Sequence, residues 1–274
     1  MSKNLSAVAS TEFDSEVKQA YQGGSKLRDT VTHRGNVTGG TYTFRAVGKG
    51  LANQKPSQGL VTPMDISHSE QACVLQDWIA PEYTDIFDDA EVNFSEQQEL
   101  AEAIASALGR REDQLIIDAA SAASAGGAVA AGGTGLTAAK VITSSKHFND
   151  AGVPTEDRTA PISAAGLEDL LNEDKATSFD YQQVRALIDG QINTGFGFTW
   201  KVIESRDEGG IPKSGATRTS TFYHKRAIGL ATGIGPRTEV NYVAERTSWL
   251  ANGLLKANAV ARDTAGLVDV AYDE

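Results

Sequence analysis

The longest helical pattern in the chain runs from Asn93 to Ala125, and it constrains the fold more than any other stretch. Ser95 followed by Gln98 forms a capping box, and Gly126 with Gly127 ends the pattern. Apolar residues recur at helical spacing along one stripe, at Leu100, Ile104, Ala107, Leu108, Leu115 and Ala119. A helix of about 28 residues is about 42 Å long, as wide as a small domain. We therefore expect a spine helix, with a sheet on its apolar stripe and other subunits on its charged faces.

Size and composition limit the class of protein. The chain of 274 residues can form one large domain or two modest ones. Cys73 is the single cysteine, so no disulfide can form within the chain and a reducing compartment is expected. No apolar run reaches the roughly 18 residues of a membrane span, and the N-terminus lacks the apolar region of a signal peptide. We therefore expect a soluble intracellular product with no membrane association.

Charge is unevenly distributed along the chain, whose formal net charge is −11. Residues 1–60 carry 8 Lys/Arg and 4 Asp/Glu, whereas residues 61–135 carry 2 Lys/Arg and 14 Asp/Glu. This basic segment and this acidic segment can attract each other, within one molecule or between copies. The other interpretation of the same pattern is two solvated surfaces that do not meet.

The first 63 residues combine regular patterns with few large apolar side chains. Residues 11–22 have the spacing of a short amphipathic helix. Tyr42, Phe44 and Ala46 alternate with polar residues as in a strand, and residues 60–66 return as a second extended segment. Leu, Ile, Val and Phe number only 12 in residues 1–63, close to the level of disordered segments. Since an isolated hairpin is marginally stable, we expect an arm and a hairpin that become ordered on a neighbouring copy.

The remaining sequence predicts an α+β fold, because helices and strands mix without regular βαβ spacing. Residues 70–83 are expected to form a half-buried strand limited by Pro81, with Cys73, Leu75 and Ile79 on one face. Further strands are predicted over residues 160–163, 195–205, 220–231, 239–244 and 267–271, with a turn at 264–266.

Helices and connections complete this prediction. Thr137 is the expected N-cap of a helix that turns Val141, Ile142 and Phe148 inward and stops at Gly152. Two more short helices are expected over residues 163–174 and 180–190. The small-residue run 125–135 predicts a flexible connection, and the polar segment 205–219 predicts a surface loop or a lid.

The sequence contains no positive signal for catalysis, a cofactor or a metal. The GGTG run at 132–135 lacks the ending of a P-loop, no G-x-S-x-G elbow occurs, and the four histidines are isolated. The acidic run 85–91 could bind a cation but lacks EF-hand spacing, so a solvated or partner-facing surface is the preferred interpretation. Groove-reading motifs for nucleic acid are also missing, although an acidic inner wall could enclose DNA without adsorbing it.

In this order, the features resemble the major capsid proteins of tailed bacteriophages with the Hong Kong 97 fold, in a podovirus-type branch. The segments FDSEVKQAYQGGSKLRDTV and GGTYTFRAVGKGLANQK look like the arm and hairpin of that family. GLTAAKVITSSKHFNDAGVP resembles the start of its A domain, and LIDGQINTGFGFTWKVIES matches it at Gly190, Ile192, Gly197 and Phe198. YHKRAIGLATG and ANAVARDTAGLVDVA resemble its terminal strands.

The resemblance implies a division of the chain and a function. It implies an N-terminal arm at 1–32, an extended loop at 33–70, a P domain at 71–135 with its spine helix at about 95–125, an A domain at 136–235, and return strands of the P domain at 236–274. The implied function is a major capsid protein that self-assembles into pentamers and hexamers of an icosahedral head enclosing double-stranded DNA, with no catalytic residues. The alternatives are an encapsulin-like nanocompartment shell protein and an unrelated soluble α+β binding protein or enzyme.

The resemblance also implies where copies meet, because the extended loop of such proteins lies over the P domain of a neighbour. The predicted contact residues on the loop side are Arg34, Tyr42, Phe44, Arg45, Lys49 and Lys55. Their predicted partners on the neighbour are Asp85, Asp88, Asp89, Glu96 and Glu99. A separate scaffolding protein is expected, because the long charged N-terminal extension of some relatives is missing. A portal and a cement protein are further candidate partners, and the expected location is the virion after assembly in the host cytoplasm.

Overall fold

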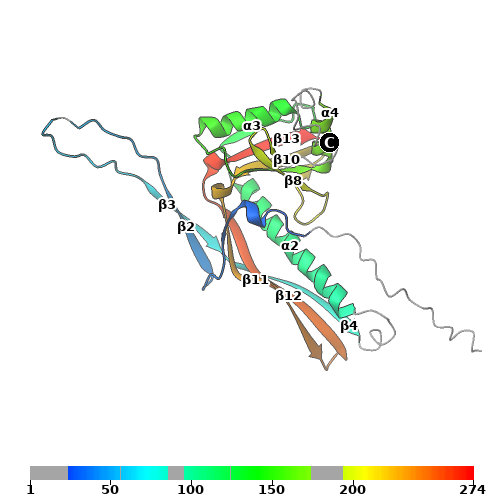
Figure 1. Cartoon of the computed structure of the whole chain (residues 1–274). Coiled ribbons are helices and arrows are strands. Elements are labelled where there is room, and N and C mark those ends of the chain that lie inside the picture. The colour runs from blue at the N-terminus through cyan, green and yellow to red at the C-terminus, as the bar shows by residue number, and fades with distance from the viewer. Residues whose placement is uncertain (1–23, 56, 86–95, 124, 174–193) are drawn as a thin grey trace, which may run out of the picture.

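The structure is a computed structural model that describes residues 24–55, 57–85, 96–123, 125–173 and 194–274. A long helix lies along a four-stranded sheet and reaches a seven-stranded sheet, and a two-stranded hairpin projects from this body (Figure 1). The predicted helices over residues 11–22 and 180–190 lie outside the described residues.

The four-stranded sheet has the strand order β1-β11-β12-β4. Its strands are β1 (Thr32–Arg34), β11 (Ile228–Val243), β12 (Ser248–Ala261) and β4 (Gln76–Asp85). β1 pairs in parallel with β11, and the other pairs are antiparallel. The helix α2 (Glu96–Ala122) packs Ile104, Leu108 and Leu115 against Ala251 and Leu255 of β12. The predicted spine helix on a sheet is therefore confirmed.

The second half of α2 is buried on more sides than a narrow stripe allows. Ile116, Ile117 and Ala120 are buried together with Leu27 and Tyr223, which come from segments before β1 and from the second sheet. The prediction that subunits cover the charged faces is therefore wrong for this half, because the chain itself covers it. The 3-10 helix η1 (Arg28–Thr30) lies in the segment that closes over α2.

The seven-stranded sheet has the order β5-β13-β10-β6-β8-β7, with β9 paired to β10. Its strands are β5 (Gly127–Val129), β13 (Leu267–Asp273), β10 (Thr217–His224), β6 (Arg158–Ser163), β8 (Phe198–Ile203), β7 (Thr194–Gly195) and β9 (Lys213–Ser214). Two short 3-10 helices flank β11 and β13, namely η2 (Lys225–Ala227) and η3 (Thr264–Gly266). η3 confirms the predicted turn at 264–266.

Two helices begin directly after N-cap residues, and the first of these, Thr137, was predicted. α3 (Ala138–Asp150) begins after Thr137, whose side chain accepts a hydrogen bond from the Lys140 amide. α4 (Ala164–Asn172) begins after Ser163, which accepts from the Gly166 amide. The core of this part contains the aromatic residues Phe148, Phe198, Trp200 and Phe222. Ile142 differs from the prediction, since it lies on the outer face of α3 and is 56% exposed.

The predicted loops contain ordered structure instead. β5 lies in the run expected to be flexible, and it pairs in parallel with β13. The segment 205–219 contains β9 and the start of β10, and Arg206 within it has a side chain only 8% exposed. The prediction of a flexible connection over 125–135 is therefore wrong at 127–129, and that of a surface loop or lid over 205–219 is wrong at 213–214 and 217–219, which form strands.

The structure has two strands where the sequence predicted one over residues 70–83. At Leu75, between them, the set of alternating side chains that points to the core changes. β3 (His68–Val74) pairs with the hairpin strand β2 (Thr41–Val47), whereas β4 pairs with β12. Cys73 and Leu75 are buried, but after the change Trp78 points inward and Ile79 is 67% exposed. Pro81 does not end the strand, because β4 lies at a sheet edge where one side of the backbone needs no partner.

The returning segment of the hairpin and the domain boundaries also differ from expectation. The partner of β2 is β3, and residues 60–66 form no strand. The predicted boundary at residue 236 falls inside β11, and β13 joins the seven-stranded sheet instead of the sheet that holds β11 and β12. The chain thus crosses between the two sheets once more than the predicted division allows.

Gly253 lets α2 approach the sheet closely. A Cβ added at Gly253 would lie 2.3 Å from Cγ2 of Ile104, a branched methyl group with little freedom to move. Gly253→Ala is therefore expected to lower the free energy of unfolding by about 1–3 kcal/mol, as measured by urea denaturation. Gly235→Ala is the matched control, since an added Cβ meets no atom within 4 Å there. Equal stability of the two variants would contradict this packing.

Glu112 gives the subunit a pH-dependent stability. Its side chain is 1% exposed, and its Oε1 has no hydrogen-bond partner in the described part of the chain. Burial raises the pKa of this carboxyl, although Arg28, 3.6 Å away, opposes the shift. A folded-state pKa above the unfolded value means that stability is fully present below the unfolded pKa and falls as pH rises through the folded pKa.

Glu112→Gln is therefore expected to gain stability relative to the unmodified chain as the pH rises from about 4 to about 7. The measurement is Tm of both proteins across this range. A Tm difference that does not change with pH would contradict a raised pKa.

Candidate inter-subunit surface

The base of the hairpin is anchored to its own chain. Phe44 is 6% exposed and packs with Cys73, Leu75 and Ala231, while the Tyr42 ring meets it edge-on at a centroid distance of 4.8 Å. Gly229 on β11 is needed there, because an added Cβ would lie 2.7 Å from the Phe44 ring. Phe44 was predicted to contact a neighbour; instead, its side chain is buried within the subunit and fixes the direction of the hairpin.

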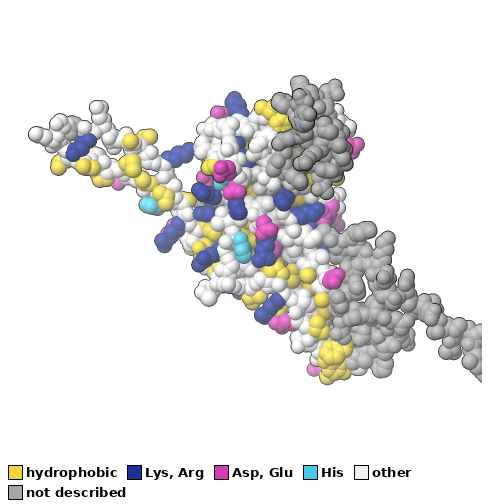
Figure 2. All heavy atoms as spheres, viewed as in Figure 1, with side chains coloured by type: hydrophobic (Ala, Val, Ile, Leu, Met, Phe, Trp, Pro, Cys, Tyr) yellow, Lys and Arg dark blue, Asp and Glu magenta, His cyan; other side chains and the backbone are white. Residues whose placement is uncertain are grey.

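The outer part of the hairpin exposes large apolar side chains. It projects beyond the body of the molecule, and apolar side chains follow its length (Figures 1 and 2). The exposed fractions are 65% for Val47, 81% for Leu51, 95% for Leu60, 77% for Val61 and 51% for Met64. An extended segment with so much exposed apolar surface is typical of a protein–protein contact.

Two of the predicted basic contact residues have partners within the subunit. Arg45 pairs with Glu70 across the hairpin at 3.2 Å, and both side chains are largely exposed. Lys49 Nζ donates to the carbonyl oxygen of Ala151 at the end of α3, at 2.8 Å. A helix C-terminus carries partial negative charge, which suits a lysine. Lys55 is exposed further out on the hairpin.

The predicted acidic partners are only partly described. Asp85 is half-buried at the end of β4. Asp88 and Asp89 lie outside the described residues, and Glu96 and Glu99 stand on the first turns of α2 with side chains that are likewise not described. Within one subunit, β4 and β1 lie at opposite edges of the four-stranded sheet, so the structure does not bring Asp85 to Arg34.

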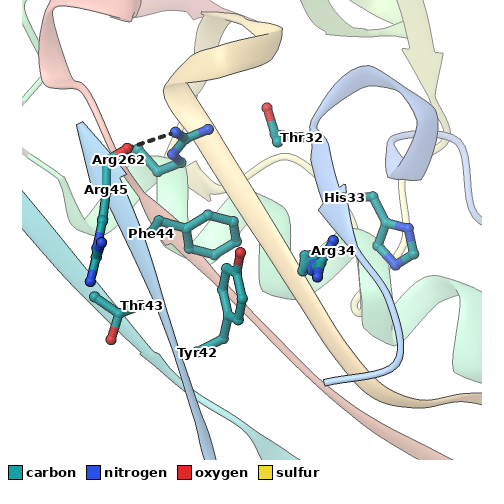
Figure 3. A pocket seen from close by; sticks show the side chains of 8 residues that line it. All are labelled: Thr32, His33, Arg34, Tyr42, Thr43, Phe44, Arg45 and Arg262. Carbon is teal, nitrogen blue, oxygen red and sulfur yellow. Dashed lines mark hydrogen bonds between the residues drawn. The ribbon is translucent and has the colours of Figure 1, made fainter. Parts of the chain in front are cut away.

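A cleft of about 630 Å³ lies between β1 and β2 (Figure 3). It is lined by Thr32, His33, Arg34, Tyr42, Thr43, Phe44, Arg45 and Arg262. The Arg34 guanidinium stands 5.9 Å from the centre of the Tyr42 ring, and that of Arg262 stands 5.2 Å from the centre of the Phe44 ring. Arg262 also donates to the carbonyl oxygen of Arg45 at 3.1 Å. Sequence reasoning missed Arg262, because only the fold brings the end of β12 to the hairpin.

The charge of this cleft comes from its arginines. Partial burial lowers the pKa of His33, and the nearby Arg28 lowers it further, so His33 is neutral at physiological pH. Its ring Nε2 shares a hydrogen bond with Thr232 Oγ1 at 3.1 Å. Burial raises the pKa of the Cys73 thiol to about 11, which leaves it protonated and a poor nucleophile.

Comparisons with known proteins agree on one class. The model of a family described as "Phage capsid protein" matches residues 5–274. No curated protein matches the sequence. In the described part of the chain, no helix is both long enough and apolar enough to cross a membrane.

Solved phage capsids share the fold at low sequence identity. The capsid of cyanophage P-SCSP1u has 15% identity and a TM-score of 0.72, with 98% of this chain and 94% of that chain covered. The head of Helicobacter pylori bacteriophage KHP40 has 7% identity and a TM-score of 0.71, with 95% of each chain covered. The capsid of Ralstonia phage GP4 has 10% identity and a TM-score of 0.70, with 97% and 96% covered. The predicted α+β fold of the Hong Kong 97 type is thus confirmed.

Proposed function

Because the chain belongs to the phage capsid protein family and is a major capsid protein, we propose that its copies form the pentamers and hexamers of an icosahedral head. This head encloses double-stranded DNA, which the protein contains without reading its sequence. A protein of this family is a structural component of the virion. The encapsulin-like alternative is not favoured, since the family match and the similar structures cited above are phage capsids.

The projecting hairpin is the observation that carries this proposal. Leu60 and Val61 are 95% and 77% exposed on a segment that points away from the body (Figure 1). Burying a leucine or valine side chain contributes about 1.5–3 kcal/mol, so covering this segment with a neighbour stabilises each contact substantially. Many copies of one modest contact, closed by symmetry, then hold a shell together.

The finer assignments follow from the same proposal. Residues 33–70 act as the extended loop, and Lys55, Arg34 and Arg45 approach acidic side chains of a neighbour such as Asp85. Assembly takes place in the host cytoplasm with a separate scaffolding protein, a portal and a cement protein as partners.

The test is to image the purified recombinant protein by negative-stain electron microscopy, together with its sedimentation profile with and without nuclease. Closed shells, capsomers or tubes are the expected result. A protein that remains monomeric at high concentration, even when a scaffolding protein of the same phage is co-expressed, would contradict the proposal. Native particles that hold an enzyme in place of DNA would contradict the assigned cargo.

A further inference from the structure

Lys49 lies where the paired base of the hairpin gives way to its outer part. β2 and β3 pair as far as Val47 and His68. The next backbone hydrogen bond runs from the Gly48 amide to the Ser67 carbonyl oxygen at 2.8 Å, and it is the last one across the hairpin in the part of the chain that the structure describes. The described residues further out therefore have no ladder of backbone hydrogen bonds to hold their direction.

A single polar contact joins this outer part to the body of the subunit. Lys49 Nζ donates to the carbonyl oxygen of Ala151 at 2.8 Å. Gly152 lies at the same place, since a Cβ added to it would stand 3.9 Å from Nζ of Lys49. Between the described residues 48–55 and 57–67 and the rest of the subunit, this is the one hydrogen bond or ion pair. Lys49 is therefore the polar group that holds the outer hairpin to its own chain.

The acceptor of this hydrogen bond is the C-terminal end of α3. Gly152 adopts a left-handed conformation, with φ of 73°, and its amide donates to the Asn149 carbonyl oxygen. The Val153 amide donates to the Phe148 carbonyl oxygen, which completes the hydrogen bonding that commonly closes a helix. These bonds do not use the carbonyl oxygen of Ala151, which accepts from the lysine instead. The partial negative charge at a helix C-terminus favours a cation at this point.

The charged groups around this helix end leave Lys49 weakly held. The titratable side chains at or beside the end of α3 are Lys146, His147, Asp150, Glu156, Asp157 and Arg158. Arg158 is 1% exposed and donates to two backbone carbonyl oxygens after the helix. The three acidic residues are exposed, and in the described part of the chain none of them forms an ion pair with Lys49. An exposed lysine at a helix end contributes little free energy, so the bond can open and close.

We propose that Lys49 is a reversible latch, whose bond to the end of α3 holds the outer hairpin in one direction in the unassembled subunit and so presets it for a neighbouring copy (Figure 1). The role in assembly rests on the proposed function, whereas the latch itself is a property of the single subunit. A segment that is already held in one direction loses less conformational entropy when a neighbour covers it. Lys49 thus acts within its own subunit, in place of the predicted contact with an acidic residue of a neighbour.

Double electron–electron resonance on the unassembled subunit tests the latch directly. Spin labels are attached through Asn53→Cys on the outer hairpin and Lys146→Cys on α3, both at exposed positions. Cys73 is 1% exposed, and burial raises the pKa of its thiol to about 11, so it takes up little label. Lys49→Met is expected to raise the population of other hairpin directions by about two- to fivefold, seen as a broader distribution of label distances. Lys55→Met is the matched control on the same hairpin and is expected to leave the distribution unchanged.

Assembly of the same variants without labels gives a second readout. Lys49→Met is expected to need at least about twofold more protein before half of it sediments as capsomers or shells. Lys49→Arg keeps the cation and is expected to behave like the original chain, and Tm of each unassembled variant checks that the subunit is folded.

Three outcomes would overturn the latch. The first is an equal distance distribution for Lys49→Met and the original chain. The second is weaker assembly with an unchanged distribution, which would place Lys49 at a neighbouring copy. The third is easier assembly of Lys49→Met, which would show that the bond opposes the contact between copies. If the original chain does not assemble at all, the proposed function fails, while the distance distributions still decide whether the latch exists.

Discussion

Asp113→Ala is expected to lower the free energy of unfolding of the subunit by about 3–5 kcal/mol, because it breaks a buried ion pair and removes the acceptor of three further hydrogen bonds. Asp113 lies on α2 with no exposed surface, 2.7 Å from Nη2 of Arg206. Its carboxylate also accepts hydrogen bonds from the Ser25 hydroxyl and from the amides of Lys26 and Leu27, at 2.9–3.0 Å. One side chain thus holds together the spine helix, the segment before β1 and the segment that carries Arg206. Its loss leaves several buried donors without an acceptor.

Asp118→Ala on the same helix is the matched control. Asp118 is exposed and accepts a hydrogen bond from Gln114 Nε2 at 2.6 Å, so its removal is expected to cost less than about 0.5 kcal/mol. Urea denaturation of the unassembled subunits measures both changes. Arg206→Ala should destabilise the subunit nearly as much as Asp113→Ala, and the double variant little more than either. Similar small losses for Asp113 and Asp118 would contradict the buried network.

Replacing Leu51, Leu60 and Val61 together with serine is expected to reduce assembly by at least about a hundredfold while leaving the subunit folded. These side chains are 81%, 95% and 77% exposed, so the unassembled subunit gains little from them. If a neighbour buries them, each contributes about 1.5–3 kcal/mol to the contact, and 1.4 kcal/mol corresponds to a factor of ten in an equilibrium constant.

The control for this hairpin variant is Ile142→Ser, which replaces a 56% exposed apolar residue on the outer face of α3. Sedimentation velocity separates assembled from unassembled protein, and Tm of the unassembled fraction reports on folding. A triple variant that forms shells with the original yield would show that the apolar hairpin is not covered by a neighbour. An equal loss of assembly with Ile142→Ser would show that the effect is not specific to the hairpin.

Local signals in the sequence correctly predicted the elements that depend on neighbouring residues. The apolar spacing of α2 and the N-caps Thr137 and Ser163 act within a few residues, and all three helices begin close to the expected positions. The alternation at Tyr42 and Phe44 likewise predicted β2 and the face that these two side chains share, although not that Phe44 is buried within its own subunit. Such features are set by backbone geometry and by the chain's own hydrogen bonds.

Features that depend on distant parts of the chain were missed. The change of face at Leu75 arises because the strand leaves the hairpin and joins a different sheet, which no local pattern encodes. β5 is stabilised by pairing with β13, about 140 residues later, so its small residues looked like a linker. Asp113 and Arg206 are separated by 93 residues in the sequence. From the sequence alone, each would be interpreted as a separate charged side chain on the surface, because no local pattern indicates that the two form a pair.

The candidate site likewise combines features that the local sequence indicates with features that depend on distant parts of the chain. The basic residues of the hairpin could be recognised from the distribution of charge, whereas its exposed apolar residues, such as Leu51, Leu60 and Val61, were not among the predicted contacts. The burial of Phe44 against β11 and the arrival of Arg262 at the cleft required the sheet order. Which acidic side chains meet the basic residues of the hairpin depends on how two copies pack, and the sequence of a single chain does not contain that geometry.

A cryo-electron microscopy reconstruction of particles assembled from this chain is the most direct test of its role. We predict a closed shell in which the hairpin of each copy lies over a neighbour, with Leu60 and Val61 buried. Shells in which the hairpin extends into solvent would contradict its role as the contact between copies. Failure of this chain to form any shell, or native phage heads whose wall is built from a different protein, would contradict the assignment of this chain as the shell-forming subunit.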